Sequence, residues 1–305
     1  MKLSVRALGA VLPLAAMSLY ACSGDVTTTP QADAGLDAAL DSSTQDSAVD
    51  SAVDSAVDAT PDADAAPPFS VKNLTGLALW LDATTGVTGT SAVSAWADQS
   101  GNNNNAAMAT ANYQPALVAA SLGGKPAIHF AGGTHLTIAD AATLQWGTGD
   151  FYVALALKHT TVSSTYGMVF SKQNPGLSPY IGPGLFANFA LPSQGTTIGG
   201  QVDYNHYVSS AANALNDNVG RQFAFLRAGG KISVRLNGTQ TDAAADASSA
   251  AFDISSVGFA VFIGANTNGG QALAGDIGEI IAVKGAISSG DITNVETYLK
   301  AKYSL

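Results

Sequence analysis

The sequence predicts an all-β domain, a sandwich of two antiparallel sheets, followed by one short C-terminal helix. Between residues 77 and 138, short apolar runs are interrupted about every eight to twelve residues by Gly, Asn, Pro and Thr, which is typical of strands joined by turns. Gly229 and Gly230 separate two alternating runs, a strong hairpin signal. After residue 288 the apolar period changes from two to 3.6, which indicates a helix.

Taken in order, each strand is expected where apolar residues alternate or cluster between turn residues. Residues 151–158 are apolar on both faces, which predicts a central strand. Trp80 and Trp96 lie in apolar strands and are interpreted as core residues, whereas Trp146 lies between turn residues and is left open. The expected strands cover residues 77–81, 93–96, 127–130, 135–138, 151–158, 166–172, 221–228, 231–238, 258–265 and 274–283.

The helix is expected over residues 288–303. Ser288 with Asp291 three residues later approximates a capping box. An apolar stripe follows at the spacing of one helix face, so the helix should pack against the sandwich. The stripe consists of Ile292, Val295, Tyr298 and Leu299.

Residues 1–21 have the organisation of an export signal. Lys2 and Arg6 precede a mostly apolar run at residues 7–17 that is too short to span a membrane. Residues 19–22 resemble the lipobox of bacterial lipoproteins, although Tyr20 departs from its usual small or β-branched residue. The resemblance implies that Cys22, the only cysteine, is the lipid-modified first residue of the mature protein, and that it anchors the chain in the outer membrane. The alternative is an ordinary cleaved signal that contains a cysteine.

Residues 22–69 predict an acidic, disordered tether. Ten aspartates and no Lys or Arg lie between residues 24 and 69, and a four-residue repeat, Asp-Ser-Ala-Val, starts at Asp46. Aspartates four residues apart would repel along a helix, so a coil is favoured, able to hold a domain roughly 40 Å from the membrane. The alternative, a Ca²⁺-binding repeat, needs glycine turns that these repeats lack.

The acidity belongs to the tether. The whole chain has a formal charge of −10, yet residues 70–305 hold 11 basic and 13 acidic residues. No basic patch indicates a nucleic-acid partner, and no acidic cluster indicates a cationic substrate.

Several stretches resemble the concanavalin A-like, or laminin-G-like, jelly-roll domains of bacterial surface proteins. They are Trp-Leu-Asp-Ala at 80–83, the run at 93–102 and Gly-Lys-Pro-Ala-Ile-His-Phe at 124–130. Asn237-Gly238 matches the turn after the family's hairpin, and residues 275–303 resemble its strand-then-helix ending. The resemblance implies one jelly-roll domain over residues 70–305.

Enzymes of this fold are most often glycoside hydrolases or polysaccharide lyases, and their motifs are missing. A retaining hydrolase needs two carboxylates about 5 Å apart. This domain holds only two glutamates, Glu279 and Glu296, and no Glu-x-Asp-x-x-Glu strand. Ala127 stands where the lyase motif before His129 requires Gln, and the four histidines show no metal-ligand spacing. The histidines are His129, His135, His159 and His206.

Two binding sites are considered. The family resemblance implies a rim Ca²⁺ held by Asp98, Asn102 and Asp276, since Ca²⁺ prefers oxygen ligands; the alternative is an Asx turn and a local ion pair. A sugar site is suggested by aromatic, amide and carboxylate side chains in one stretch; the alternative is a solvent-facing strand. The candidate sugar-binding residues are Tyr180, Asn188, Gln201, Asp203, Tyr204 and His206.

The resulting hypothesis is a surface lipoprotein that displays a non-catalytic carbohydrate- or glycoconjugate-binding module. It rests on fold-level analogy. One alternative is a polysaccharide-degrading enzyme, which a clustered His and Asp pair would support. Another is a structural or adhesive surface protein, for which a flat apolar patch is expected.

Overall fold

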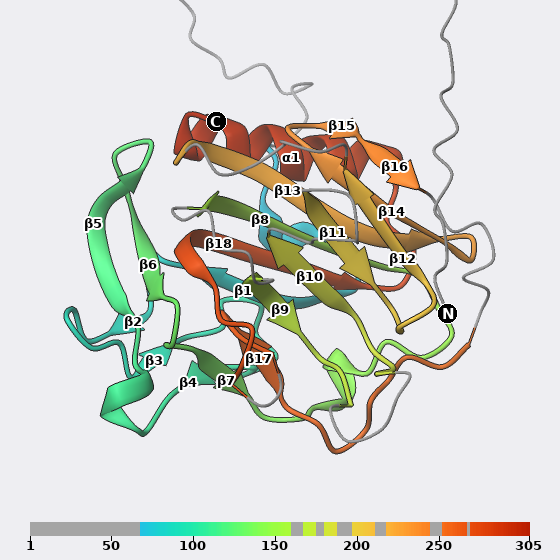
Figure 1. Ribbon diagram of the computed structural model, residues 1–305. Coiled ribbons are helices and arrows are strands. Elements are labelled where there is room, and N and C mark those ends of the chain that lie inside the picture. The colour runs from blue at the N-terminus through green and yellow to red at the C-terminus, as the bar shows by residue number, and fades with distance from the viewer. Residues whose placement is uncertain are drawn as a thin grey trace, which may run out of the picture. The chain divides into compact units, whose positions relative to one another are not determined.

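The computed structural model of the protein describes residues 68–159, 167–174, 180–187, 197–210, 218–244, 252–266 and 269–305. In these ranges the chain forms two antiparallel sheets and one α-helix (Figure 1). The predicted all-β sandwich with a C-terminal helix is confirmed. Cys22, residues 22–67 of the predicted tether and Asn188 lie outside the described residues. Each helix in the described part of the chain is too short or too polar to cross a membrane.

The first sheet, called sheet A, has eight strands among the described residues. The predicted central strand β8 (Phe151–His159) lies between β13 (Gly220–Ala228) and β18 (Ala274–Lys284), as expected from its two apolar faces. The other members are β15 (Thr239–Gln240), β14 (Lys231–Leu236), β6 (Lys125–Ala131), β5 (Ala116–Leu122) and β1 (Leu77–Asp82), which also pairs with β18.

The second sheet, called sheet B, has ten strands among the described residues. Their order across the sheet is β16 (Asp242–Ala244), β12 (Tyr207–Ser210), β11 (Ile198–Gln201), β10 (Gly184–Ala187), β9 (Gly167–Ser171), β17 (Val261–Ile263), β7 (Leu136–Ile138), β4 (Ala106–Ala107), β3 (Ala95–Trp96) and β2 (Val87–Thr88). Three short 3-10 turns accompany the strands, at Val71–Asn73, Ala111–Tyr113 and Ala142–Leu144.

The main core lies between the two sheets, where the inward side chains of both meet. Trp96 is fully buried in it, as predicted, and so is Trp146, which the sequence left open. Trp80 is only partly buried, because its indole faces a polar cluster described below. A second core lies on the opposite face of sheet A, under the helix.

The hairpin between β13 and β14 forms as predicted. Gly229 and Gly230 have φ of 57° and 76°, the conformation that a tight hairpin turn requires and that glycine adopts without strain. Asn237 and Gly238 form the next turn with φ of 51° and 86°.

The helix α1 (Ser289–Tyr303) starts at the predicted cap. The Ser288 hydroxyl accepts from the Asp291 N–H at 3.0 Å and donates to the Asp291 carboxylate at 2.8 Å. Val295 and Leu299 of the predicted stripe are buried against sheet A, together with Tyr303.

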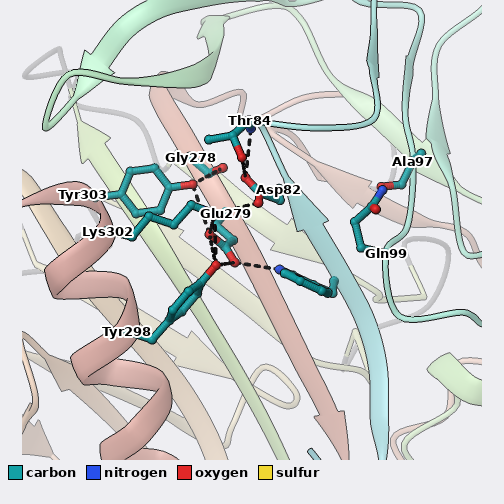
Figure 2. Close-up of polar contacts among 10 residues, drawn as sticks. Asp82, Thr84, Ala97, Gln99, Gly278, Glu279, Tyr298, Lys302 and Tyr303 are labelled. Carbon is teal, nitrogen blue, oxygen red and sulfur yellow. Dashed lines mark hydrogen bonds and ion pairs between the residues drawn. The ribbon is translucent and has the colours of Figure 1, made fainter. Parts of the chain in front are cut away.

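A polar cluster pins α1 to sheet A, and we call it the Glu279 cluster (Figure 2). Glu279 on β18 is fully buried. Its carboxylate accepts from the Trp80 indole at 2.6 Å and pairs with the Lys302 ammonium at 2.7 Å. Lys302 also pairs with Asp82 at 2.6 Å, and the Tyr298 hydroxyl donates to Glu279 at 3.0 Å. The Tyr303 hydroxyl oxygen lies 3.1 Å from the same carboxylate.

Burial controls the proton affinities in the Glu279 cluster. Desolvation raises the pKa of Glu279 despite its contact with Lys302. Desolvation and the neighbouring Glu279 charge raise the pKa of Tyr298 to about 12. For Lys302, burial alone would lower the pKa, but the charge of Glu279 and hydrogen bonds to Asp82 and Glu279 outweigh it and raise the pKa.

Candidate functional site

The turn between β11 and β12, at one end of sheet B, carries three of the six predicted sugar-binding residues. Asp203 accepts from the backbone N–H groups of Asn205 and His206 at 2.8 and 2.7 Å, and its Oδ1 lies 2.8 Å from the His206 Nδ1. The carboxylate therefore fixes the turn. This leaves Tyr204, which is 67% exposed, on the turn.

A second exposed tyrosine lies beside this turn. The Gly182 N–H donates to the Val202 carbonyl at 2.8 Å, and β10 pairs with β11 in antiparallel register. Tyr180 thus lies two residues before a backbone group that is bonded to this turn. Tyr180 is 40% exposed and has φ of 58°, a conformation that a bulky side chain rarely adopts. Such local strain is typically retained at functional positions.

Gln201 and His206 complete the part of the predicted site that the structure describes. Gln201 pairs with Tyr207 across β11 and β12 and shares with it the outer face of sheet B. The His206 ring packs 5.3 Å from the Phe252 ring. The structure thus brings Tyr180, Gln201, Asp203, Tyr204 and His206 to one end of the sheet, whereas Asn188 lies outside the described residues. We call these five residues the rim site.

The predicted Ca²⁺ ligands do not form one oxygen cage. Asp98 accepts from the Trp80 and Asn104 N–H groups and from Ser100, which is the Asx-turn alternative. Asn102 donates its amide to the Leu77 carbonyl at 2.8 Å. No group of three or more His, Cys, Asp or Glu side chains in the described ranges could hold a metal ion. Asp98 and Asn102 both bond to the backbone of β1, whereas Asp276 bonds to other side chains, and binding of Ca²⁺ stays a prediction for experiment.

Asp276 belongs instead to a cluster on the outer face of sheet A, which we call the Asp276 cluster. Its Oδ1 lies 2.5 Å from the His129 Nδ1, and its Oδ2 lies 2.8 Å from the Lys158 ammonium and 2.5 Å from the Ser121 hydroxyl. Burial alone would raise the pKa of Asp276, but the hydrogen bonds from Lys158, Ser121 and His129 outweigh it and lower the pKa. Sequence reasoning named Asp276 and His129 separately and missed their contact.

Similar folds occur in solved structures, although no family model and no curated protein sequence matches the chain. The binding domain of Paraclostridial Mosquitocidal Protein 1 superimposes with a TM-score of 0.54 at 10% identity, over 75% of this chain and 53% of that chain. Domain 4 of AbnA, a GH43 extracellular arabinanase from Geobacillus stearothermophilus, in complex with arabinotriose, gives 0.50 at 14% identity, over 73% and 99%.

A GH54 α-L-arabinofuranosidase soaked with a cyclic sulfate inhibitor gives a TM-score of 0.53 at 14% identity, over 70% of this chain and 51% of that chain. This chain therefore spans about half of the toxin binding domain and of the arabinofuranosidase. At such identities the likeness establishes the β-sandwich fold alone.

Proposed function

We propose that the protein is a carbohydrate-binding module, displayed at the cell surface as a lipoprotein, and that the rim site binds the sugar. The observation that carries this proposal is the exposed ring of Tyr204 on a turn that the Asp203 carboxylate fixes, with a second exposed tyrosine, Tyr180, on the segment before β10. An exposed aromatic ring offers a platform for a sugar, because the apolar face of a pyranose or furanose packs on an aromatic face.

Polar groups next to the rings supply specificity. Gln201 has both donors and acceptors on its amide, and His206 adds a ring nitrogen next to the same turn. The fold neighbours support the proposal indirectly, since one of them is described in complex with arabinotriose and another is an arabinofuranosidase. A short oligosaccharide is therefore the first ligand class to test.

The two glutamates support binding rather than glycosidic cleavage by paired carboxylates. Glu279 is fully buried under α1, and Glu296 pairs with the Arg235 guanidinium at 2.6 Å. Neither carboxylate is placed to serve as nucleophile or acid at an exposed glycosidic bond.

A glycan array tests the binding. The purified full-length protein is applied once with Ca²⁺ and once with EDTA; selective binding in both conditions supports the rim site. Binding that EDTA abolishes would support a metal-dependent lectin and redirect attention to Asp98 and Asp276. A blank array in both conditions would overturn the proposal in favour of a structural or adhesive protein.

The variant Tyr204→Ala locates the site. Loss of one stacked ring should weaken binding of an array-selected oligosaccharide roughly tenfold. Tyr113→Ala is the matched control, because Tyr113 is a comparably exposed tyrosine, 48% accessible, on the β4–β5 connection. Equal affinity of the Tyr204→Ala variant and the wild type for this oligosaccharide, measured by calorimetry, would contradict the assignment of the rim site.

The anchor rests on the sequence of residues 1–22. Lipid attached to Cys22 would hold the chain in the outer membrane, with the acidic tether between membrane and sandwich. A Cys22→Ser variant should leave the membrane fraction of the producing cells, because it lacks the thiol that would carry the lipid. Retention of this variant in the membrane fraction would contradict lipid anchoring.

A further inference from the structure

The Asp276 cluster is assembled from neighbouring strands in register. Asp276 on β18 pairs with His129 on β6 and with Lys158 on β8. Lys158 lies two residues after Ala156, which packs under α1, so these side chains share the helix-side face of sheet A. Ser121, near the end of β5, reaches the same carboxylate. The cluster thus lies beyond the region that α1 covers.

The carboxylate of Asp276 is held on all sides. Only 5% of its side chain is exposed, and each oxygen has a partner: His129 on Oδ1, and Lys158 with Ser121 on Oδ2. Lys158 also donates to the Ser121 carbonyl at 3.3 Å, which fixes the ammonium. The positive charge and the three donors keep Asp276 ionised at neutral pH.

This arrangement determines where the neutral imidazole of His129 carries its proton. An ionised carboxylate can only accept hydrogen bonds, so the Nδ1 that faces Asp276 must hold the hydrogen. The other ring nitrogen, Nε2, then carries the lone pair. The His129 side chain is 37% exposed, and no described residue hydrogen-bonds to its Nε2. A carboxylate that fixes tautomer and orientation in this way is the usual support of a general base.

We propose that His129 is a general base that activates water for the hydrolysis of a carboxylic ester, with Asp276 as its positioning residue. His129 Nε2 takes a proton from water while the water oxygen bonds to the acyl carbon. The carbon–oxygen bond to the alcohol then breaks, and the alkoxide leaves with the proton from Nε2. Water and ester become acid and alcohol, and no other reactant is needed.

The substrate class follows from the groups present. Glycosidic cleavage needs a second carboxylate as nucleophile or base, whereas acyl transfer to water needs one base and a stabiliser of negative charge on oxygen. Lys158 supplies the positive charge: its ammonium has three donors, of which the described residues take two, on Asp276 and on the Ser121 carbonyl.

Hydrolysis of p-nitrophenyl acetate by the full-length protein tests the proposal. We expect turnover above buffer, and we expect His129→Gln to lower it by about 100-fold or to the buffer rate, since a positioned general base contributes about 10²–10⁴-fold. Lys231→Gln is the control, because this variant also removes one reactive amine from the surface. Lys231 is exposed at the hairpin turn that starts β14, several strands away from β6 in sheet A. Turnover no faster than buffer, or equal rates of His129→Gln and wild type, would overturn the proposal.

Asp276→Asn tests the positioning role. Removal of the carboxylate that fixes the His129 tautomer should lower kcat and leave KM close to the wild-type value, because the base is misoriented while substrate binding is unchanged. A purely structural role would lower the amount of folded protein and leave kcat per folded molecule unchanged. The probe contains no sugar, so these results are independent of the glycan array.

Discussion

The two polar clusters on strand β18 differ in whether the helix α1 covers them. Asp276 and Glu279 are three residues apart and lie on the same face of sheet A, with Lys158 and Lys302 as their respective cations. The Glu279 cluster lies under α1 with its carboxylate fully buried. The Asp276 cluster lies beyond the helix and leaves the His129 ring open to solvent.

The difference shows which physical term decides the ionisation of a carboxylate in a sheet. Glu279 shares one ammonium with Asp82, so two negative charges compete for one positive charge where water is excluded, and desolvation raises the pKa of Glu279. For Asp276 the donors of Lys158, Ser121 and His129 outweigh burial, and the pKa is lowered. The Glu279 cluster fixes the helix, whereas the Asp276 cluster leaves the His129 ring exposed to solvent.

A bulge at Gly278 brings both carboxylates to one face. Asp276 is opposite Lys158 and Glu279 is opposite Ala156, with a register shift between them. Residues three apart in a regular strand would point to opposite faces. Glycine is required at the bulge because an added Cβ would lie 2.6 Å from the Tyr303 ring. The Gly278 carbonyl accepts from the Tyr303 hydroxyl at 2.9 Å, which ties the bulge to the helix end.

Removal of the Lys302 charge from the Glu279 cluster should have the largest effect on stability. Lys302→Met leaves two buried carboxylates without a charge partner, and we expect a loss of about 3–5 kcal/mol in the free energy of unfolding. Guanidinium denaturation of the full-length protein measures it.

Two further variants make this test specific. Lys300→Met, on the same last turn of α1, has no ion pair among the described residues and should cost less than about 0.5 kcal/mol. The double variant Lys302→Met with Glu279→Gln should recover part of the loss, because one buried charge is removed. If Lys302→Met lost less free energy of unfolding than Lys300→Met, the stabilising role of the Glu279 cluster would be contradicted.

The sequence predicted the sandwich well where local signals and tertiary structure agree. The Gly229-Gly230 hairpin, the Ser288 cap and the central position of β8 are all encoded in short windows. The alternation pattern failed at β18, because a strict period of two places Asp276 and Glu279 on opposite faces of the strand. It gives no sign of the bulge that brings them to the same face. Glycine at 278 within an apolar run was the one available hint.

The candidate sites depended on contacts far apart in the chain. Asp276 meets Ser121 across 155 positions, and its pairing with His129 spans 147. No local pattern predicts such contacts, so the sequence assigned Asp276 to a metal site by resemblance. The residues proposed for the rim site are mostly close in sequence, from Gln201 to His206, so a local pattern was enough to suggest them. The positive φ of Tyr180 has no sign in the sequence.

The smallest expected effect is the pH dependence of stability, which should have opposite signs for Asp276 and Glu279. Because the pKa of Asp276 is lowered on folding, its stabilisation is present above the unfolded value of about 3.9 and is lost as pH falls through the folded pKa. We expect Asp276→Asn to cost about 1–2 kcal/mol at pH 7 and progressively less below pH 4.

Glu279 has the opposite sign: its raised pKa favours the protonated folded form, so stability linked to it falls as pH rises from about 4.3 through its folded pKa. Denaturation midpoints of wild type, Asp276→Asn and Glu279→Gln between pH 3 and 7 measure both signs. The gap between wild type and Asp276→Asn should close on acidification. A gap that widens instead would mean that Asp276 is not held ionised by Lys158 and His129, and the general base would lose its support.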